Sequence, residues 1–189
     1  MSRYIRPRIG GATIFFTVTL AERGSRVLVD HIGVLREAVT VTRAERPFQI
    51  DAAVVMPDHL HMVWTLPEDD AEYSVRWGAI KARFVMGVRR AGVGVPDGLP
   101  EVRSGRYAGL KPGLRADKRE SAVWQRRFWE HHIRDAADYR SHVEYCWMNP
   151  VKHGYVERPE EWPFSSYRRD REVWGMGAPE DGSGRLDGM

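Results

Sequence analysis

Hydrophobic and polar positions along this chain repeat with two periods, and each period predicts one kind of element. Short runs rich in β-branched and aromatic residues predict strands, whereas apolar residues spaced three and four apart predict helices. The strands are predicted at residues 12–20, 48–56, 59–66 and 124–131. The helices are predicted at 31–43, at 71–91, from Asp135 through Tyr145 towards Pro150, and as a short segment within 158–174.

The predicted elements follow the order strand, helix, strand, strand, helix, strand, and then further helices. This split βαβ order predicts an α+β fold of the ferredoxin-like type, with helices packed on an antiparallel sheet. Many unrelated activities use this fold, so it does not name a function. We expect one domain over residues 1–174, in which the Gly-, Pro- and charge-rich segment 92–120 is a mobile insertion. Residues 175–189 are expected to form a disordered tail.

Cysteine content and hydropathy exclude several classes of protein. Cys146 is the one cysteine, so the chain forms no intrachain disulfide and no cysteine-based zinc site. The first residues lack the apolar stretch of a signal peptide. No segment approaches the roughly 20 apolar residues of a membrane span. We therefore expect a cytoplasmic protein that makes no contact with a membrane.

The kind of basic residue says more than the net charge of +3 does. Of the 29 basic residues 25 are arginine, whose planar guanidinium pairs with phosphate and stacks on bases. Seven Trp and seven Tyr add flat surfaces on which unpaired bases could stack. A GC-rich genome with ordinary core aromatics would give the same composition. Composition therefore permits nucleic-acid binding without establishing it.

Two histidines, His59 and His61, are separated by one residue within a predicted strand. Side chains two apart on a strand point to the same face, about 6.5–7 Å apart, so both imidazoles could reach one metal ion. Leu60, Met62 and Trp64 would then point into the core. On spacing alone, the pair also fits polar positions on a half-solvated strand, because so short a motif recurs by chance.

A predicted helix offers a third ligand and a nucleophile. Tyr145 and Asn149 are four residues apart and therefore lie on one helix face. An Asn149 amide oxygen could complete a His-His-Asn set, and such mixed nitrogen and oxygen ligands suit Mg²⁺ or Mn²⁺. The Tyr145 hydroxyl would lie one turn from the metal. Alternatively, Tyr145 is a core aromatic residue and Asn149 simply ends the helix before Pro150.

Three segments of the chain resemble the REP-associated tyrosine transposases, bacterial relatives of the single-tyrosine insertion-sequence transposases. The segments are RPFQIDAAVVMPDHLHMVWTLP, WQRRFWEHHIRD and YCWMNPVKHGYVERPEEWPFSSYRR. They occur in the family's order, and the likeness covers most of residues 10–169. The family lies within the wider HUH endonuclease class, named for histidine, hydrophobic residue, histidine.

The resemblance implies a metal-dependent endonuclease and strand transferase that acts on single-stranded DNA near repetitive palindromic hairpins. His59 and His61 would bind the metal, and Tyr145 would form a 5′-phosphotyrosine with the DNA. Asn149 takes the place of the third ligand, which is often Gln in the wider class. The protein would act as a monomer or a homodimer.

Basic and aromatic residues near these segments are the predicted DNA contacts. Arg126 and Arg127 stand beside Trp124 and Trp129 in a basic, aromatic cluster suited to unpaired bases, and Lys152 could meet a phosphate. The resemblance adds Arg168 and Arg169 as contacts to the DNA backbone. The predicted DNA-binding set is therefore Arg126, Arg127, Trp124, Lys152, Arg168 and Arg169.

Other hypotheses remain open from the residues. A DNA-binding module of the same fold that has lost catalysis would act as a repressor or architectural factor. A two-histidine phosphoesterase would need two H-x-Ser/Thr motifs, which the chain lacks. An RNA-binding domain is a further alternative without a recognisable signature.

Tyr139 is a rival nucleophile on another helix face. His131 and His132 face opposite sides of their strand, so they cannot chelate jointly.

Overall fold

The strands and helices occur in the predicted order. The computed structural model describes residues 8–92 and 123–174. The strands are β1 (Thr13–Thr19), β2 (Gln49–Val55), β3 (His59–Thr65) and β4 (Trp129–His132). The helices are α1 (Val27–Asp30), α2 (Ile32–Glu45), α3 (Tyr73–Arg90), α4 (Ala136–Lys152) and α5 (Tyr167–Val173), with a 3-10 turn η2 (Pro159–Glu161).

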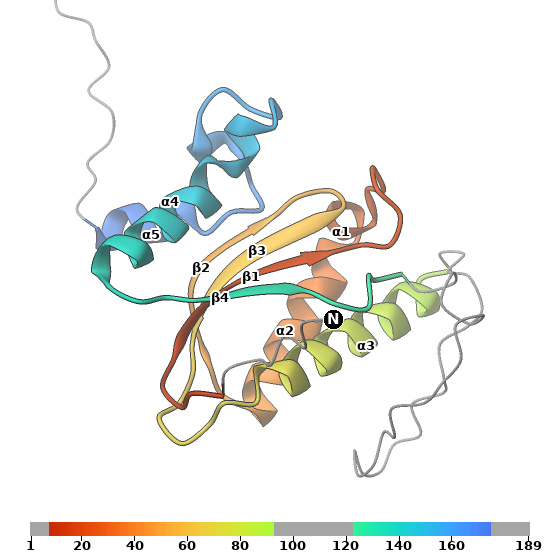
Figure 1. The fold of residues 1–189 in the computed structure, drawn as a ribbon. Helices are drawn as coiled ribbons and strands as arrows, with labels where there is room; N and C mark the ends of the chain where they lie inside the picture. The colour runs from red at the N-terminus through yellow and green to blue at the C-terminus, as the bar shows by residue number, and fades with distance from the viewer. Residues whose placement is uncertain (1–7, 93–122, 175–189) are drawn as a thin grey trace, which may run out of the picture.

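The four strands form one antiparallel sheet in the order β2-β3-β1-β4, which Figure 1 shows from one face. β1 and β3 pair along their whole length, from Thr13 opposite Thr65 to Thr19 opposite His59. β4 is an edge strand that pairs with β1 alone. This strand order and direction confirm the predicted ferredoxin-like fold.

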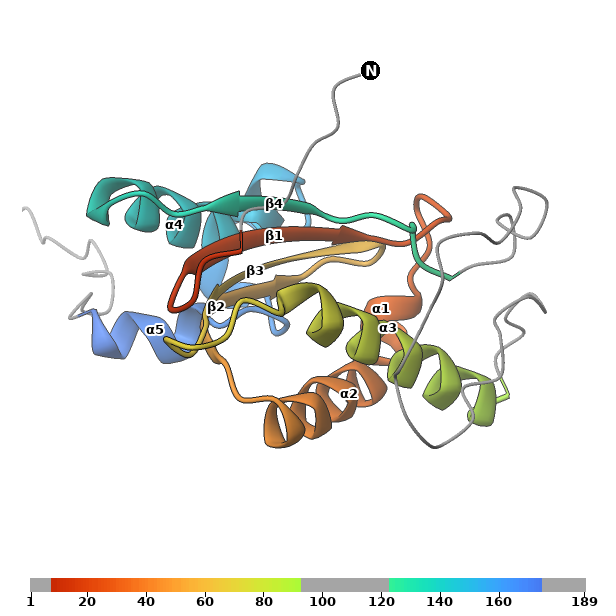
Figure 2. The same ribbon diagram turned by 60° about the horizontal axis from the view of Figure 1, so that its bottom comes forward.

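The two faces of the sheet carry different helices. In Figure 2, α2 and α3 lie side by side beneath the sheet, and α4 lies on its other side. Alternate strand residues divide between two cores. The larger core, against α2 and α3, includes Phe16, Leu60 and Trp64. The smaller core includes Phe15 and Val63, together with Cys146 and Trp147 of α4. The odd-numbered positions of β3, His59 and His61 among them, therefore face α4.

Several boundaries differ from the predicted ones. β4 begins at Trp129 rather than 124, although Trp124 still forms an isolated bridge with Leu20. α4 continues through Pro150 to Lys152, although proline has no N–H to donate to the carbonyl four residues earlier. The predicted insertion at 92–120, apart from Gly92, and the predicted tail at 175–189 lie outside the described residues. Within the described parts of the chain, no helix has both the length and the apolar character needed to span a bilayer.

Candidate active site

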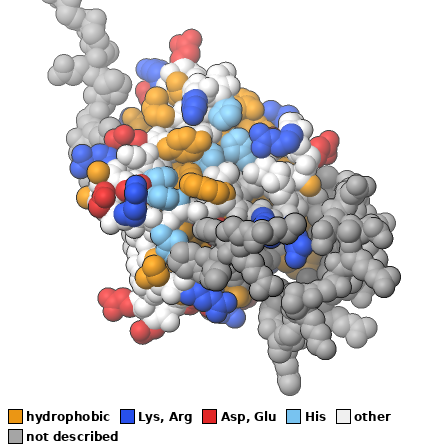
Figure 3. All heavy atoms as spheres, in the orientation of Figure 1, with side chains coloured by type: hydrophobic (Ala, Val, Ile, Leu, Met, Phe, Trp, Pro, Cys, Tyr) orange, Lys and Arg blue, Asp and Glu red, His pale blue; other side chains and the backbone are white. Residues whose placement is uncertain are grey.

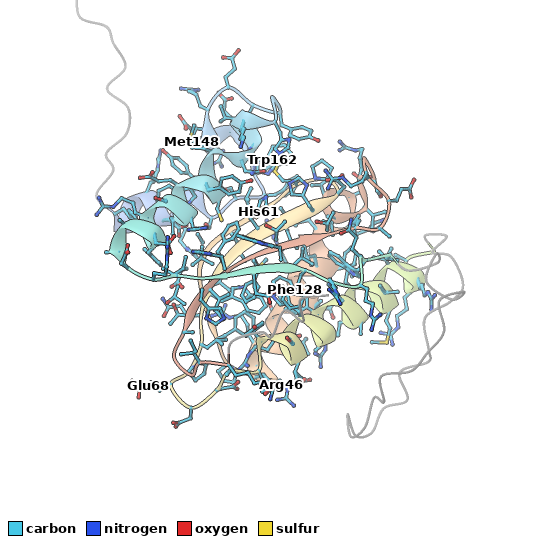
Figure 4. All side chains as sticks on the ribbon, in the orientation of Figure 1. Arg46, His61, Glu68, Phe128, Met148 and Trp162 are labelled. Carbon is cyan, nitrogen blue, oxygen red and sulfur yellow. The ribbon has the colours of Figure 1, made fainter. Side chains whose placement is uncertain are left out.

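His59 and His61 lie together on the face of β3 that α4 covers. Their ring centroids are 5.1 Å apart, and the residues are only 8% and 4% exposed. Leu60, between them, points to the opposite face and is fully buried in the larger core. Figure 4 shows His61 on the α4 side of the strands. The predicted division of this strand into a histidine face and a core face is therefore confirmed.

Both imidazoles are held through Nδ1, which leaves Nε2 of each ring available to a ligand. His61 Nδ1 lies 2.9 Å from Oγ1 of Thr17, its cross-strand partner on β1. His59 Nδ1 lies 2.6 Å from Oδ1 of Asp58. An ionised carboxylate only accepts hydrogen bonds, so His59 Nδ1 donates this one, and Nε2 is the nitrogen left to face a ligand. A partner on the second nitrogen is typical of metal-binding histidines, since it fixes the ring and the tautomer.

Asp58 is itself fixed by the loop after β1. The Gly24 backbone N–H donates to Asp58 Oδ2 at 2.8 Å, and Arg23 Nε lies 3.4 Å from the same oxygen. Burial acts to raise the pKa of Asp58, but the hydrogen bonds from Gly24 and His59 outweigh it, so the pKa lies below its usual value. Gly24 has φ of +79°, a conformation that glycine adopts without strain. Asp58 is therefore an ionised acceptor for His59 at neutral pH.

His61 is held as a neutral imidazole. Its burial, the largest cause, together with the electrostatic influence of His59, His153 and Lys152, lowers the pKa of His61 to about 3. Burial disfavours the charged form of a base because the protein interior solvates charge less well than water does. When Nδ1 donates to Thr17 Oγ1, the neutral ring presents an unprotonated Nε2, and that atom can bind a cation.

Helix α4 brings Tyr145 against the histidine pair. The helix begins at Asp135, whose side chain accepts hydrogen bonds from the backbone N–H groups of Ala137 and Asp138, as an N-cap does. The Tyr145 ring meets His61 edge-on, with centroids 5.1 Å apart and planes at 78°. Tyr145 is 39% exposed, so its hydroxyl is accessible to a large substrate.

Asn149 of α4 lies between two residues that contact the histidines, one within the helix and one at its C-cap. Tyr145, four residues earlier, contacts His61, and His153, four residues later, has its ring 5.5 Å from that of His59. All three residues share one helix face, so the Asn149 side chain faces the same part of β3. Asn149 is 1% exposed, and neither of its amide atoms has a hydrogen-bond partner among the described residues.

An unpaired buried amide costs free energy, so its presence here needs a reason. A cation held by His59 Nε2, His61 Nε2 and Asn149 Oδ1 would supply that reason for the amide oxygen. Two nitrogens and one oxygen form an open donor set of the kind that accepts Mg²⁺ or Mn²⁺ and leaves positions for substrate oxygens. The residues present therefore fit the metal that the sequence pattern predicts.

Comparison with known proteins identifies the family. The chain is 42% identical over 170 residues to a REP-associated tyrosine transposase of Escherichia coli (strain K12), which covers 90% of this chain and 85% of the relative. The chain belongs to the REP-associated tyrosine transposase family. The resemblance noted in the sequence, and with it membership of a family of transposase enzymes, is thereby confirmed.

A second relative and a solved structure agree with this assignment. A protein of Haemophilus influenzae, provisionally named as another member of the family, is 38% identical over 189 residues, covering 99% of this chain and 96% of the relative. A solved structure of a REP-associated tyrosine transposase bound to a REP hairpin matches with a TM-score of 0.72 and 39% sequence identity, covering 100% of this chain and 95% of that chain. No protein-family model matches the chain.

Tyr139, the rival nucleophile, lies in a different environment. Its ring packs in the smaller core and stacks on Trp174, with centroids 6.1 Å apart. Burial and the negative charges of Asp51 and Asp170 raise the pKa of its phenol. A phenol with a raised pKa is a weaker source of phenolate, so Tyr145 is the better candidate nucleophile.

The predicted DNA-binding residues differ in how exposed they are. Arg126 and Arg127 are exposed just before β4, and Lys152 is exposed with its Nζ 5.3 Å from the centre of the Tyr145 ring. The prediction that Trp124 contacts DNA is wrong. Trp124 is 5% exposed and packs against Phe84, so no face of its indole is free for a base. The sequence could not distinguish Trp124 from Trp129, which is 55% exposed.

The two C-terminal arginines are exposed but already hydrogen-bonded to the protein. Arg168 Nε donates to the Glu160 carbonyl at 2.9 Å. Arg169 donates to the Asp51 carbonyl of β2 at 2.9 Å and also pairs with Asp170. Arg169 thus fastens α5 to the sheet, and only the remaining part of its guanidinium could meet a phosphate.

The surface around the candidate site carries histidine, hydrophobic and basic side chains. Figure 3 shows histidine side chains gathered on this face, beside hydrophobic side chains and close to groups of Lys and Arg. Sequence reasoning missed two of the supporting residues. The role of Asp58 could have been predicted from the sequence, because its carboxylate directly precedes His59. The role of Thr17 could not have been predicted, because only the pairing register of β1 and β3 places it opposite His61.

A second group of metal-ligand side chains lies beside the first. The ligand atoms of His131, Asp138 and His142 all lie within 4.8 Å of one another. Asp138 Oδ2 already accepts hydrogen bonds from His131 Nε2 at 2.9 Å and from the backbone N and Nε of Arg134. The His131 and His142 nitrogens of this group already have partners on Asp138, so its own hydrogen bonds account for the cluster, whereas the buried Asn149 amide has no partner among the described residues. His59, His61 and Asn149 therefore form the stronger candidate metal site.

Proposed function

We propose that this chain is a metal-dependent single-strand DNA endonuclease and strand transferase that acts on REP hairpin DNA, with Tyr145 as its nucleophile. The observation that carries the proposal is the convergence of Tyr145, Asn149 and the two histidines from α4 and β3. The hairpin substrate follows from the related transposase that was solved bound to a REP hairpin. The reaction would take place in the bacterial cytoplasm, on chromosomal DNA.

His59, His61 and Asn149 would hold the divalent cation, Mg²⁺ or Mn²⁺. When bound, the cation would stabilise negative charge on the scissile phosphate and favour the phenolate of Tyr145. Such help is needed because an ordinary phenol, with a pKa of about 10, is mostly protonated at neutral pH. Thr17 and Asp58 hold the two imidazoles in place throughout the reaction, so little reorganisation is required.

Tyr145 Oη would attack the phosphorus of one phosphodiester. A Tyr–O–P bond forms as the bond from phosphorus to the 3′ oxygen breaks, and the departing 3′ oxygen takes up a proton. The products are a 5′-phosphotyrosine and a free 3′-hydroxyl. Because one phosphoester bond replaces another, a 3′-hydroxyl from a second strand can reverse the step and join new ends without a nucleotide cofactor.

Positive side chains around Tyr145 suit this substrate. Lys152 lies over the Tyr145 ring, where its ammonium would stabilise both the phenolate and the adjacent phosphate. Arg126 and Arg127 are exposed and free to follow the DNA backbone. The presence of a complete candidate active site favours an enzyme over the catalytically silent binding module.

The test is a cleavage assay on an oligonucleotide hairpin that carries single-stranded flanks and labels at both ends. We expect a nick in a flank with Mg²⁺ or Mn²⁺, no nick with EDTA, and none in the fully paired duplex. The His59→Ala variant should bind the hairpin and fail to cleave it. Tight binding without cleavage under every metal condition would favour the silent binding module instead.

A further inference from the structure

The side chain of Trp129 is exposed to solvent although it is large and aromatic. It is 55% exposed, more than any other large hydrophobic side chain among the described residues. It begins β4, the edge strand, and Cα of Trp129 pairs with that of Thr17 on β1. Because side chains alternate along a strand, Trp129 and His131 point to the same face, which is the face of α4 and the active site.

Trp129 forms the outer member of a column of three rings. Its ring lies nearly parallel to that of His131, with centroids 6.0 Å apart and planes at 10°. His131 in turn stacks on His142 of α4, at 4.6 Å and 16°. The two inner rings are partly buried, whereas Trp129 is exposed to solvent.

Asp138 fixes the two inner rings of the column. Its Oδ2 accepts from His131 Nε2 at 2.9 Å. His142 Nδ1 lies 2.8 Å from the Asp138 backbone carbonyl oxygen and 3.1 Å from Asp138 Oδ1. The Asp138 side chain is only 8% exposed, and it stands in the first turn of α4. One carboxylate thus fastens the edge strand to the helix that carries Tyr145. A platform held in place before binding loses little entropy when a ligand stacks on it.

Phe15 connects this column to the active site. Its ring contacts Trp129 and Tyr145, each with centroids 5.8 Å away, and stacks on His61 at 5.5 Å. Trp129 therefore lies one ring away from the nucleophile. Exposed arginines stand on both sides in the sequence: Arg127 before it, and Arg134, whose side chain is 74% exposed. Their charge complements a phosphodiester backbone that passes the site.

We propose that the exposed face of Trp129 is the stacking site for an unpaired base that flanks the phosphate attacked by Tyr145, and that Asp138, through His131 and His142, holds this site in position. The inference deepens the proposed function and rests on it. Stacking on an aromatic ring is tolerant of sequence, because every base has a flat face. The site would therefore select for an unpaired, unstacked nucleotide rather than for a particular base.

The test uses Tyr145→Phe as the parent protein, so that DNA binds without being cleaved. The fluorescent base 2-aminopurine is placed at successive positions of the single-stranded flanks of a REP hairpin. We expect binding to quench one flank position. Trp129→Ala should abolish that quenching and weaken binding of the flanked hairpin by roughly tenfold to a hundredfold, while Trp129→Phe keeps both. Trp174→Ala, which removes an exposed tryptophan elsewhere, should behave like the parent.

The outcomes separate this inference from the proposed function. If the parent binds the flanked hairpin and Trp129→Ala matches it in affinity and quenching, the ring column is structural and the inference is wrong. If active protein with Tyr145 also fails to cleave, and the parent binds no flanked hairpin, the proposed function fails and the inference falls with it. Melting temperatures of all variants check that exposed positions were changed without unfolding the protein.

Discussion

The ring of Tyr145 lies edge-on to the ring of His61, with their centroids 5.1 Å apart. One residue comes from a helix on one face of the sheet and the other from the central strand β3, so their meeting depends on the whole fold. Thr17 Oγ1 hydrogen-bonds to His61 Nδ1 and fixes the ring, and burial keeps the ring neutral. The relationship places a partly exposed tyrosine beside two hydrogen-bonded histidines that are candidate metal ligands.

Replacing Asn149 should separate its chemical role from any structural role. In Asn149→Leu the unpaired buried amide is lost, so we expect the free energy of unfolding to stay the same or rise by about 1 kcal/mol. Mn²⁺ affinity, measured by calorimetry, should fall at least tenfold, and DNA cleavage should be lost. Asn149→Gln, which keeps an amide oxygen, should retain part of both. A leucine variant that still binds Mn²⁺ and cleaves DNA would rule out Asn149 as a ligand.

Removing the groups behind the histidines should weaken metal binding without unfolding the protein. Asp58→Asn and Thr17→Val are each expected to lower Mn²⁺ affinity by about 10–100-fold, because the imidazoles lose their orientation. Thr13→Val is the matched control: Thr13 lies on the same strand and bonds to Thr65, away from the histidines. Equal Mn²⁺ affinities in Thr17→Val and Thr13→Val would show that Thr17 does not support the site.

Burial of His61 should make stability depend on pH in metal-free protein. The pKa of His61 is lowered from 6.5 to about 3 on folding, so between these values the unfolded chain binds a proton that the folded chain does not. The free energy of unfolding should therefore fall as the pH is lowered from about 6.5 towards 3, by up to about 1.4 kcal/mol per pH unit.

Urea denaturation in EDTA between pH 7 and pH 4.5 measures this slope, above the range in which Asp58 and Asp138 titrate. His61→Asn, which cannot take up the proton, should give a flatter curve than the natural protein. Curves of identical slope would mean that His61 is protonated in the folded state.

The hydrogen bonds of Asp138 should stabilise the junction of β4 and α4. The bond from His131, with those from Arg134, holds the pKa of Asp138 well below its usual value. Its contribution to stability is therefore present above an unfolded pKa near 3.8 and is lost as the pH falls through the folded pKa. At pH 7, Asp138→Asn should lower the free energy of unfolding by about 1–2 kcal/mol, since charge-assisted hydrogen bonds are lost.

Asp135→Asn is the matched control for that measurement, because asparagine also caps a helix N-terminus and should change stability little. The difference between the natural protein and Asp138→Asn should shrink as the pH falls below 3.8. A difference that stays constant down to pH 2 would show that the carboxylate charge is not what stabilises the junction.

The fold and the face of the histidine pair could be predicted because they depend on local periodicity. Alternation along 59–66 placed Leu60, Met62 and Trp64 in the core and the histidines opposite, as the structure confirms. The four-residue spacing of Tyr145 and Asn149 likewise predicted a shared helix face.

The supporting residues could not be predicted because they depend on tertiary packing. Thr17 reaches His61 only through the register of β1 and β3. Trp124 and Trp129 flank the same basic pair, and the packing of Phe84 on one of them decides which is buried. The contacts of Asp138 and His142 with His131 form only because α4 packs against β4.

The most direct test of the central claim is mass-spectrometric mapping of the covalent adduct formed with a labelled, flanked REP hairpin in Mn²⁺. An adduct should appear on a denaturing gel, disappear with EDTA, and map to the peptide containing Tyr145. Tyr145→Phe should form none, whereas Tyr139→Phe should form as much as the natural protein. An adduct that persists in Tyr145→Phe, or that maps to any other residue, would contradict the assignment of Tyr145 as the nucleophile.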